Sequence, residues 1–134
     1  MNAYRTYTNA NVTTASGPRI MMTLFETALR HMRTAQTAYA RGDYRTGGDS
    51  AERATAIVLG LQATLKHEIA PGLCEQLDAL YSFVVGRLTL AIGNTSELHI
   101  EEAERVFLPI VEAFDQAVAA EAAPPMAMPR AAAL

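Results

Sequence analysis

The 134-residue sequence has few of the residues that form covalent links or reactive sites. It contains one cysteine, Cys74, and no tryptophan, so no disulfide can form within the chain. No basic cluster at a helix start accompanies Cys74, which favours a small residue in or near the core over a reactive thiol. The first residues, MNAYRTYTN, contain neither the basic nor the apolar region of a secretory signal. We therefore expect a cytoplasmic protein.

Basic residues are also scarce. Eleven Lys and Arg stand against 14 Asp and Glu, the formal net charge is −3, and Lys66 is the single lysine. A nucleic-acid interface needs clustered basic side chains, so we expect no nucleic-acid partner. The apolar runs are far shorter than the roughly 20 residues that span a bilayer, so we expect no membrane insertion either.

The sequence lacks the motifs of the common catalytic and metal sites. Di-metal sites in helical bundles use Glu-x-x-His motifs, but this chain has none, and its three histidines, His31, His67 and His99, are far apart. Gly-x-Ser-x-Gly, phosphate-loop and Gly-x-Gly-x-x-Gly motifs are absent too. The sequence therefore predicts a protein that is not an enzyme, holds no metal and needs no cofactor.

Four segments carry apolar side chains every three or four residues, which is the spacing of one helix face. The first expected helix spans about 18–40, and the second runs from 43 or 49 to about 68. The third follows the Pro71-Gly72 break and ends near 92, and the fourth spans about 96–119. No strand-like alternation occurs, and short connections favour antiparallel neighbours. The sequence thus predicts an all-α, antiparallel four-helix bundle over 17–119. An extended N-terminal arm over 1–16 precedes it, and a disordered C-terminal tail over 120–134 follows it.

Two features modify the expected helices. Gly47-Gly48 costs about 1 kcal/mol per glycine relative to alanine inside a helix, so we expect the second helix to fray or to begin late. Pro109 removes one N–H group and crowds the carbonyl of Arg105. Because the apolar spacing continues in phase past Pro109, we expect a kink near Arg105 and not a break.

The first and third expected helices carry a second row of apolar residues beside the main stripe. The added residues are Ile20 and Leu24 in the first helix and Phe83, Val85 and Leu90 in the third. A central helix with neighbours on two sides would need such a wide stripe for the core. The other interpretation, which stays open, is a surface that binds a partner helix.

The N-terminal arm and the first helix share a pattern with a known family. Tyr7 is followed by four residues and Val12, then by Thr14-Ala15-Ser16, and LFETAL begins eight residues after Ser16. This pattern resembles the FliS family of flagellar export chaperones. Further resemblance follows in order over about residues 4–116, in the segments GDYRTG, RATAIVLGLQATL, LDALYSFVVGRLTLA and EAERVFLPIVEAF.

The chain departs from the family pattern at several positions. Gly17 stands where the family usually has a helix-opening proline, Gly86 replaces the first arginine of the third-helix signature, and Phe114 replaces a tryptophan. These departures indicate a divergent member, such as one that serves another flagellin or a second flagellar system.

The resemblance implies a binding module. Such chaperones bind the disordered C-terminal segment of flagellin in the cytoplasm, prevent its premature polymerisation and assist its delivery to the flagellar type III export gate. The positions that match family client-binding or cap residues are Tyr7, Val12, Ala15, Leu24, Leu80, Tyr81, Arg87, Leu88 and Ala91.

Within this set, the resemblance implies different roles. The three arm residues Tyr7, Val12 and Ala15 correspond to a movable cap, and the apolar helix residues to core or groove positions. Arg87 corresponds to a polar anchor at the groove edge, with a surface salt bridge as the equal alternative. A second hypothesis also stays open, in which a helical interaction or regulatory protein homodimerises through its apolar faces without an unfolded client.

Overall fold

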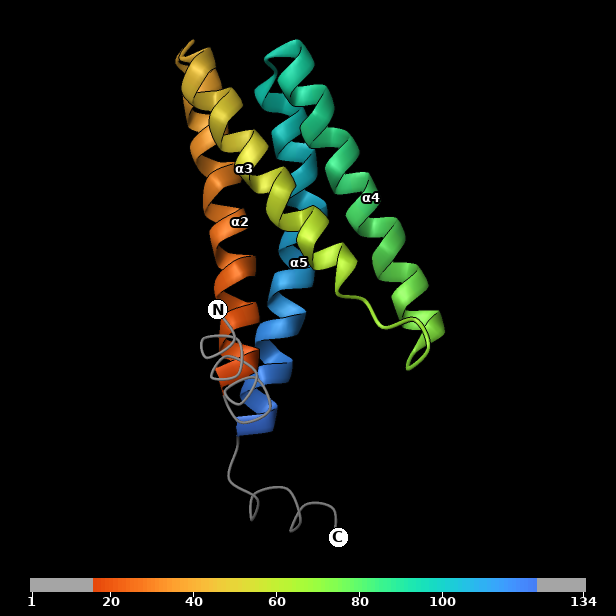
Figure 1. The fold of residues 1–134 in the computed structure, drawn as a ribbon. Coiled ribbons are helices and arrows are strands. Elements are labelled where there is room, and N and C mark those ends of the chain that lie inside the picture. The colour runs from red at the N-terminus through yellow and green to blue at the C-terminus, as the bar shows by residue number, and fades with distance from the viewer. Residues whose placement is uncertain (1–15, 123–134) are drawn as a thin grey trace, which may run out of the picture.

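The computed structural model describes residues 16–122, which form four α-helices. These are α2 (Ser16–Ala40), α3 (Tyr44–Ala63), α4 (Pro71–Asn94) and α5 (Glu97–Ala122), and successive helices run in opposite directions (Figure 1). This part of the chain contains no strand. The predicted all-α, antiparallel four-helix class is confirmed.

The four helices form a ring. α2 packs against α3 and α5, and α4 packs against the same two helices, so α2 and α4 are diagonally opposite. Figure 1 shows that α4 diverges from α2 and α5 toward its N-terminal end. Between residues 16 and 122, none of the helices is long and apolar enough to cross a membrane.

The apolar stripes of all four helices supply the core. Its largest fully buried side chains are Met32, Val58, Leu61, Val84, Leu88, Ile100 and Phe107. Phe25 of α2 lies against Phe107 and Phe114 of α5, with ring centroids 5.9 Å and 5.0 Å away. Cys74 is buried, as expected for a small residue near the core. Burial of this apolar surface is the main favourable contribution to folding.

The expectation that Gly47-Gly48 would delay or fray the second helix is wrong. α3 begins at Tyr44, and the Asp43 side chain caps it by accepting a hydrogen bond from the Thr46 N–H at 3.3 Å. Gly47 is buried, and a Cβ at this position would lie 3.0 Å or less from three ring carbons of Tyr39. The helix therefore tolerates Gly47 because the glycine admits the Tyr39 ring of α2.

The helix ends differ in part from those expected. α3 ends at Ala63, before the expected end near 68. α5 continues through Pro109 to Ala122, so the helix does not break at the proline and the expected end at 119 lies inside it. The kink near Arg105 stays a prediction. The predicted arm and tail fall almost wholly on residues 1–15 and 123–134, which lie outside the described residues.

We predict opposite effects for alanine at the two adjacent glycines. Gly47→Ala forces a Cβ into the buried Tyr39 ring, and such overpacking costs about 1–3 kcal/mol. This cost exceeds the gain of about 1 kcal/mol in helix propensity. At Gly48 the added Cβ would meet only the Tyr39 hydroxyl, at an ordinary 3.8 Å. Gly48→Ala should therefore stabilise the protein by about 0.5–1 kcal/mol.

Urea unfolding followed by far-ultraviolet circular dichroism measures both changes. The Gly48→Ala variant is the matched control, since it adds the same methyl group one residue away. Equal stabilisation by the two substitutions would show that the contact between Gly47 and Tyr39 does not constrain the fold.

Candidate interaction surface

One flank of α4 exposes a row of large apolar side chains. Leu73, Leu80, Phe83 and Leu90 are 57%, 40%, 41% and 42% exposed. Their spacing of seven, three and seven residues places them on one side of the helix. We call these four residues the α4 apolar row. Aligned exposed apolar side chains of this size are typical of a surface that binds a partner.

Polar contacts on both sides of α4 show which flank carries the row. On the α3 side, Gln62 Nε2 donates hydrogen bonds to Asp78 Oδ1 at 2.6 Å and to Ser82 Oγ at 2.9 Å. On the α5 side, Arg87 Nη1 lies 3.4 Å from Glu102 Oε1.

Phe83 and Leu90 lie four residues before and three residues after Arg87, so they share its side of the helix. The row therefore lies on the α5 flank, where the N-terminal half of α4 diverges from α5 (Figure 1).

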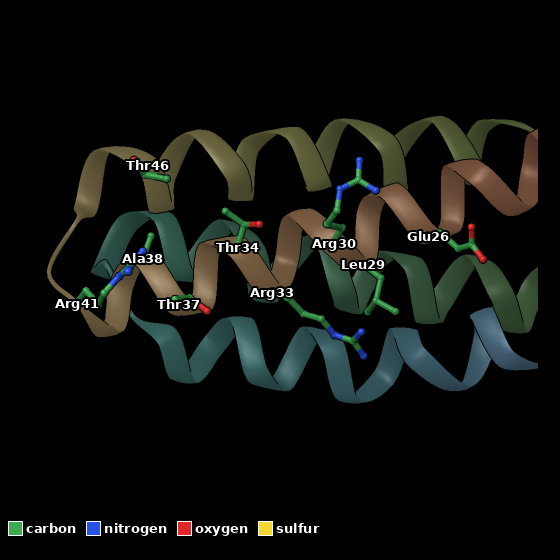
Figure 2. A pocket seen from close by; sticks show the side chains of 9 residues that line it. All are labelled: Glu26, Leu29, Arg30, Arg33, Thr34, Thr37, Ala38, Arg41 and Thr46. Carbon is green, nitrogen blue, oxygen red and sulfur yellow. The ribbon is translucent and has the colours of Figure 1, made fainter.

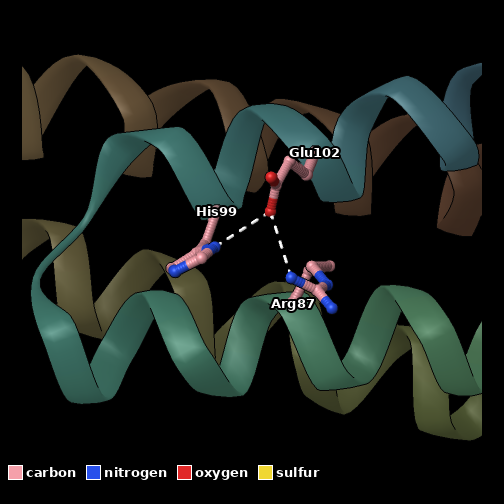
Figure 3. A network of polar contacts seen from close by, with 3 residues as sticks. All are labelled: Arg87, His99 and Glu102. Atoms are coloured by element: carbon pink, nitrogen blue, oxygen red, sulfur yellow. Dashed lines mark hydrogen bonds and ion pairs between the residues drawn. The ribbon is translucent and has the colours of Figure 1, made fainter.

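A small polar network lies beside the row and links α4 to α5. Figure 3 shows Glu102 of α5 between Arg87 of α4 and His99 of α5. Glu102 Oε1 is 2.9 Å from His99 Nδ1 and 3.4 Å from Arg87 Nη1. The Arg87 guanidinium also lies 4.9 Å from the centroid of the Phe83 ring, within the range of a cation–π contact. Arg87 is thus held by a carboxylate and by a member of the apolar row.

The network lowers the pKa of Glu102. The largest cause is the hydrogen bond with His99, and the positive charges of His99 and Arg87 act in the same direction, against a smaller opposing effect of burial. All three side chains are partly exposed, so solvent weakens their interaction.

The structure separates the residues that the family resemblance singled out. Leu24 and Leu80 are exposed, whereas Tyr81, Leu88 and Ala91 are buried in the core. Burial raises the pKa of Tyr81 to about 12. Leu80 therefore belongs to the surface, and the three buried residues act through packing.

Arg87 lies at the edge of the apolar row and forms a surface salt bridge with Glu102, and its role as a polar anchor stays a prediction. Tyr7, Val12 and Ala15 lie outside the described residues, so their role as a cap stays a prediction.

Sequence reasoning missed part of this surface. The sequence marks Phe83 and Leu90 as extra apolar residues but not as site residues. Their spacing of four and three residues from Arg87 is the signal that places them on the same side of the helix as Arg87. Leu73 has the spacing of the buried α4 residues, yet it is exposed, at the end of the helix where α4 diverges from α5. No sequence signal pairs Glu102 with Arg87, since the two lie on different helices.

Among residues 16–122, no group of three or more His, Cys, Asp or Glu side chains could hold a metal ion. The pair of His99 and Glu102 supplies two ligands, and Arg87 occupies the adjacent space with a positive charge.

We predict that the stabilisation from Glu102 depends on pH. Its folded-state pKa is lower than its unfolded-state pKa, so its contribution to stability is fully present above the unfolded-state value. The contribution is lost as the pH falls through the folded-state value, because the unfolded chain takes up the proton first. Glu102→Gln should therefore lower the Tm at neutral pH, and the difference from wild type should shrink in acid.

Thermal unfolding at several pH values tests this prediction. Glu101→Gln is the control, because Glu101 is an exposed neighbour on the same helix. A difference between wild type and Glu102→Gln that stays constant down to low pH would contradict the proposed role of the network.

Comparison with known proteins supports the resemblance seen in the sequence. The chain matches the family model described as "Flagellar protein FliS" over residues 1–121. It is also 23% identical over 108 residues to the flagellar secretion chaperone FliS of Vibrio cholerae serotype O1, a match that covers 81% of this chain and 79% of the relative. Since the family model spans most of the sequence, the chain belongs to the FliS family of flagellar proteins.

Proposed function

We propose that this flagellar export chaperone binds the disordered C-terminal segment of flagellin along the α4 apolar row. Binding in the cytoplasm keeps the segment from polymerising, and the complex then assists delivery of flagellin to the flagellar type III export gate. The observation that carries this proposal is the exposure of Leu73, Leu80, Phe83 and Leu90 on one flank of α4. The family membership and the chaperone name of the relative support the same assignment.

The row has the dimensions of a helix-binding surface. From Leu73 to Leu90 it extends about 26 Å along the axis of α4, at 1.5 Å per residue. A client segment with apolar residues every three or four positions could lay that face along the row. Arg87 at the edge offers a charged hydrogen-bond donor for a client carbonyl or carboxylate.

Folding of the client on the surface also suits a chaperone that must release it. A disordered segment loses conformational entropy when it becomes helical, and this cost of about 2–5 kcal/mol or more offsets part of the gain from burial. The complex can therefore bury a large apolar area and still dissociate at the site of export.

The alternative is a homodimer in which the apolar rows of two copies cover each other without an unfolded client. An exposed apolar flank supports this alternative as well. Binding to a flagellin peptide and the oligomeric state in solution distinguish the two functions.

We predict that the wild-type protein binds a flagellin C-terminal peptide and releases measurable heat in calorimetry. Leu80→Glu and Phe83→Glu should each weaken this binding by at least about tenfold, because a charge would be placed at the centre of the buried contact. Leu59→Glu is the control, since Leu59 is 49% exposed on α3, the helix on the other flank of α4.

Two outcomes would count against a client on the row. The first is equal weakening by Leu59→Glu, which would place binding elsewhere. The second is an absence of heat with peptides from several flagellins together with a tight dimer in sedimentation, which would favour the homodimer.

We further predict that deletion of residues 1–15, which leaves α2 intact, changes the affinity for the flagellin peptide or the self-association. Tighter peptide binding would show that the arm competes for the surface, since removing a competing segment increases the fraction of binding-competent protein. Weaker binding would show that the arm clamps the client. Unchanged affinity and oligomeric state would exclude a role for Tyr7 and Val12 as a cap.

A further inference from the structure

A second surface, of opposite character, lies on the far side of the ring from the α4 apolar row. A shallow groove of about 540 Å³ runs along the outer face of α2 to the first turn of α3 (Figure 2). Its polar lining is dominated by three arginines and three threonines: Arg30, Arg33, Arg41, Thr34, Thr37 and Thr46. We call this the basic α2 groove. It is notable in a chain whose net charge is −3.

One of the arginines already has a partner within the bundle. Arg33 Nε lies 2.8 Å from Glu104 Oε2 of α5, and Figure 2 shows its side chain turned toward that helix. Arg30 points the opposite way, toward α3, and Arg41 lies at the C-terminal end of α2. Within residues 16–122, neither Arg30 nor Arg41 forms an ion pair with an acidic side chain.

Acidic side chains balance only part of the positive charge of the groove. The carboxylate that lines the groove belongs to Glu26. Since Glu104 pairs with Arg33, Arg30 and Arg41 stand against this one carboxylate, and the groove keeps an excess of positive charge.

The distance between the hydrogen-bond donors indicates the length of a ligand that could contact all of them. Arg30 and Arg41 are separated by about 17 Å along the helix axis, with Thr34 and Thr37 between them. The guanidinium groups can each bind a carboxylate through two parallel hydrogen bonds, and the hydroxyls can donate to carbonyl oxygens. An extended peptide covers this distance in about five residues, and a helical one in about three turns.

We propose that the basic α2 groove binds an acidic segment of a partner protein, on the face diagonally opposite the α4 apolar row. This site does not depend on a client at α4. It would leave the chaperone able to hold an apolar client and an acidic partner at the same time, because the two surfaces lie on different helices of the ring.

The segments on either side of the bundle have no acidic side chains that could occupy the groove. All 14 acidic residues lie between Glu26 and Glu121, so 1–15 and 123–134 contain no Asp or Glu. A nucleic acid fits poorly, because its phosphates form a continuous charged backbone that needs a larger basic surface than this groove offers. Nucleic-acid surfaces also concentrate more basic side chains than the three in this groove.

Fluorescence anisotropy with the full chain tests the proposal. The probe is a fluorescein-labelled peptide of about 15 residues with glutamates every three or four positions, long enough to span the groove. Its twin carries glutamine at each of these positions. We expect the glutamate peptide to bind, the glutamine peptide not to bind, and added salt to weaken the binding by screening the charges.

Variants locate the binding. Arg30→Gln and Arg41→Gln should each weaken binding of the glutamate peptide about two- to fivefold, which is the range for exposed charge pairs, and the double variant should weaken it more. Lys66→Gln is the control, because Lys66 is exposed in the connection between α3 and α4, and it should have no effect. Arg33 is left unchanged because its contact with Glu104 links α2 to α5.

Several results would overturn the proposal. These are equal binding of the two peptides, equal weakening by Lys66→Gln, or tighter binding of a single-stranded oligonucleotide through the same arginines. Loss of a dimer in the arginine variants would instead identify the groove as a contact between two copies. Binding of the flagellin peptide should be unchanged in these variants, so failure at α2 and failure at α4 are distinguishable.

Discussion

The packing of α4 between α3 and α5 decides what the molecule presents to its partners. Tyr81, Val84 and Leu88 fill the core side of α4, and this contact fixes which other side chains of the helix face outward. A helix in a ring of four has two neighbours, so it can bury one face. α4 carries more apolar side chains than that face can take, and the surplus appears as an ordered row on the α5 flank.

Polar contacts on both flanks of α4 act together with apolar packing to orient the helix. Gln62 bridges α3 to Asp78 and Ser82 on one flank, and Glu102 holds Arg87 on the other. Apolar contacts are non-directional, whereas hydrogen bonds require defined distances and angles. The two sets of contacts therefore add directional constraints to the apolar packing of α4. The same ring places α2 diagonally opposite, where its outer face is free to carry the basic groove.

The fold could be predicted well from the sequence, and the surfaces less well. Periodicity identified all four helices, since apolar residues at three- and four-residue steps pack on one side wherever a core forms. The argument from glycine propensity failed at Gly47, where α3 is helical and the missing Cβ admits the Tyr39 ring of α2. Periodicity failed at Leu73, which has the correct spacing for the core but lies where α4 diverges from α5. Both failures have one cause, because propensity and spacing describe one helix while packing depends on two.

The sequence by itself determined the helix class, the approximate helix boundaries and the family, because these depend on local spacing and on motifs read in order along the chain. Only the tertiary structure decided that Leu80 is exposed while the adjacent Tyr81 is buried. It also decided that Arg87 meets Glu102, and that Arg30 and Arg41 share a groove with Thr46 of α3. These relations join residues on different helices, and their geometry follows from how the helices pack and rotate against each other.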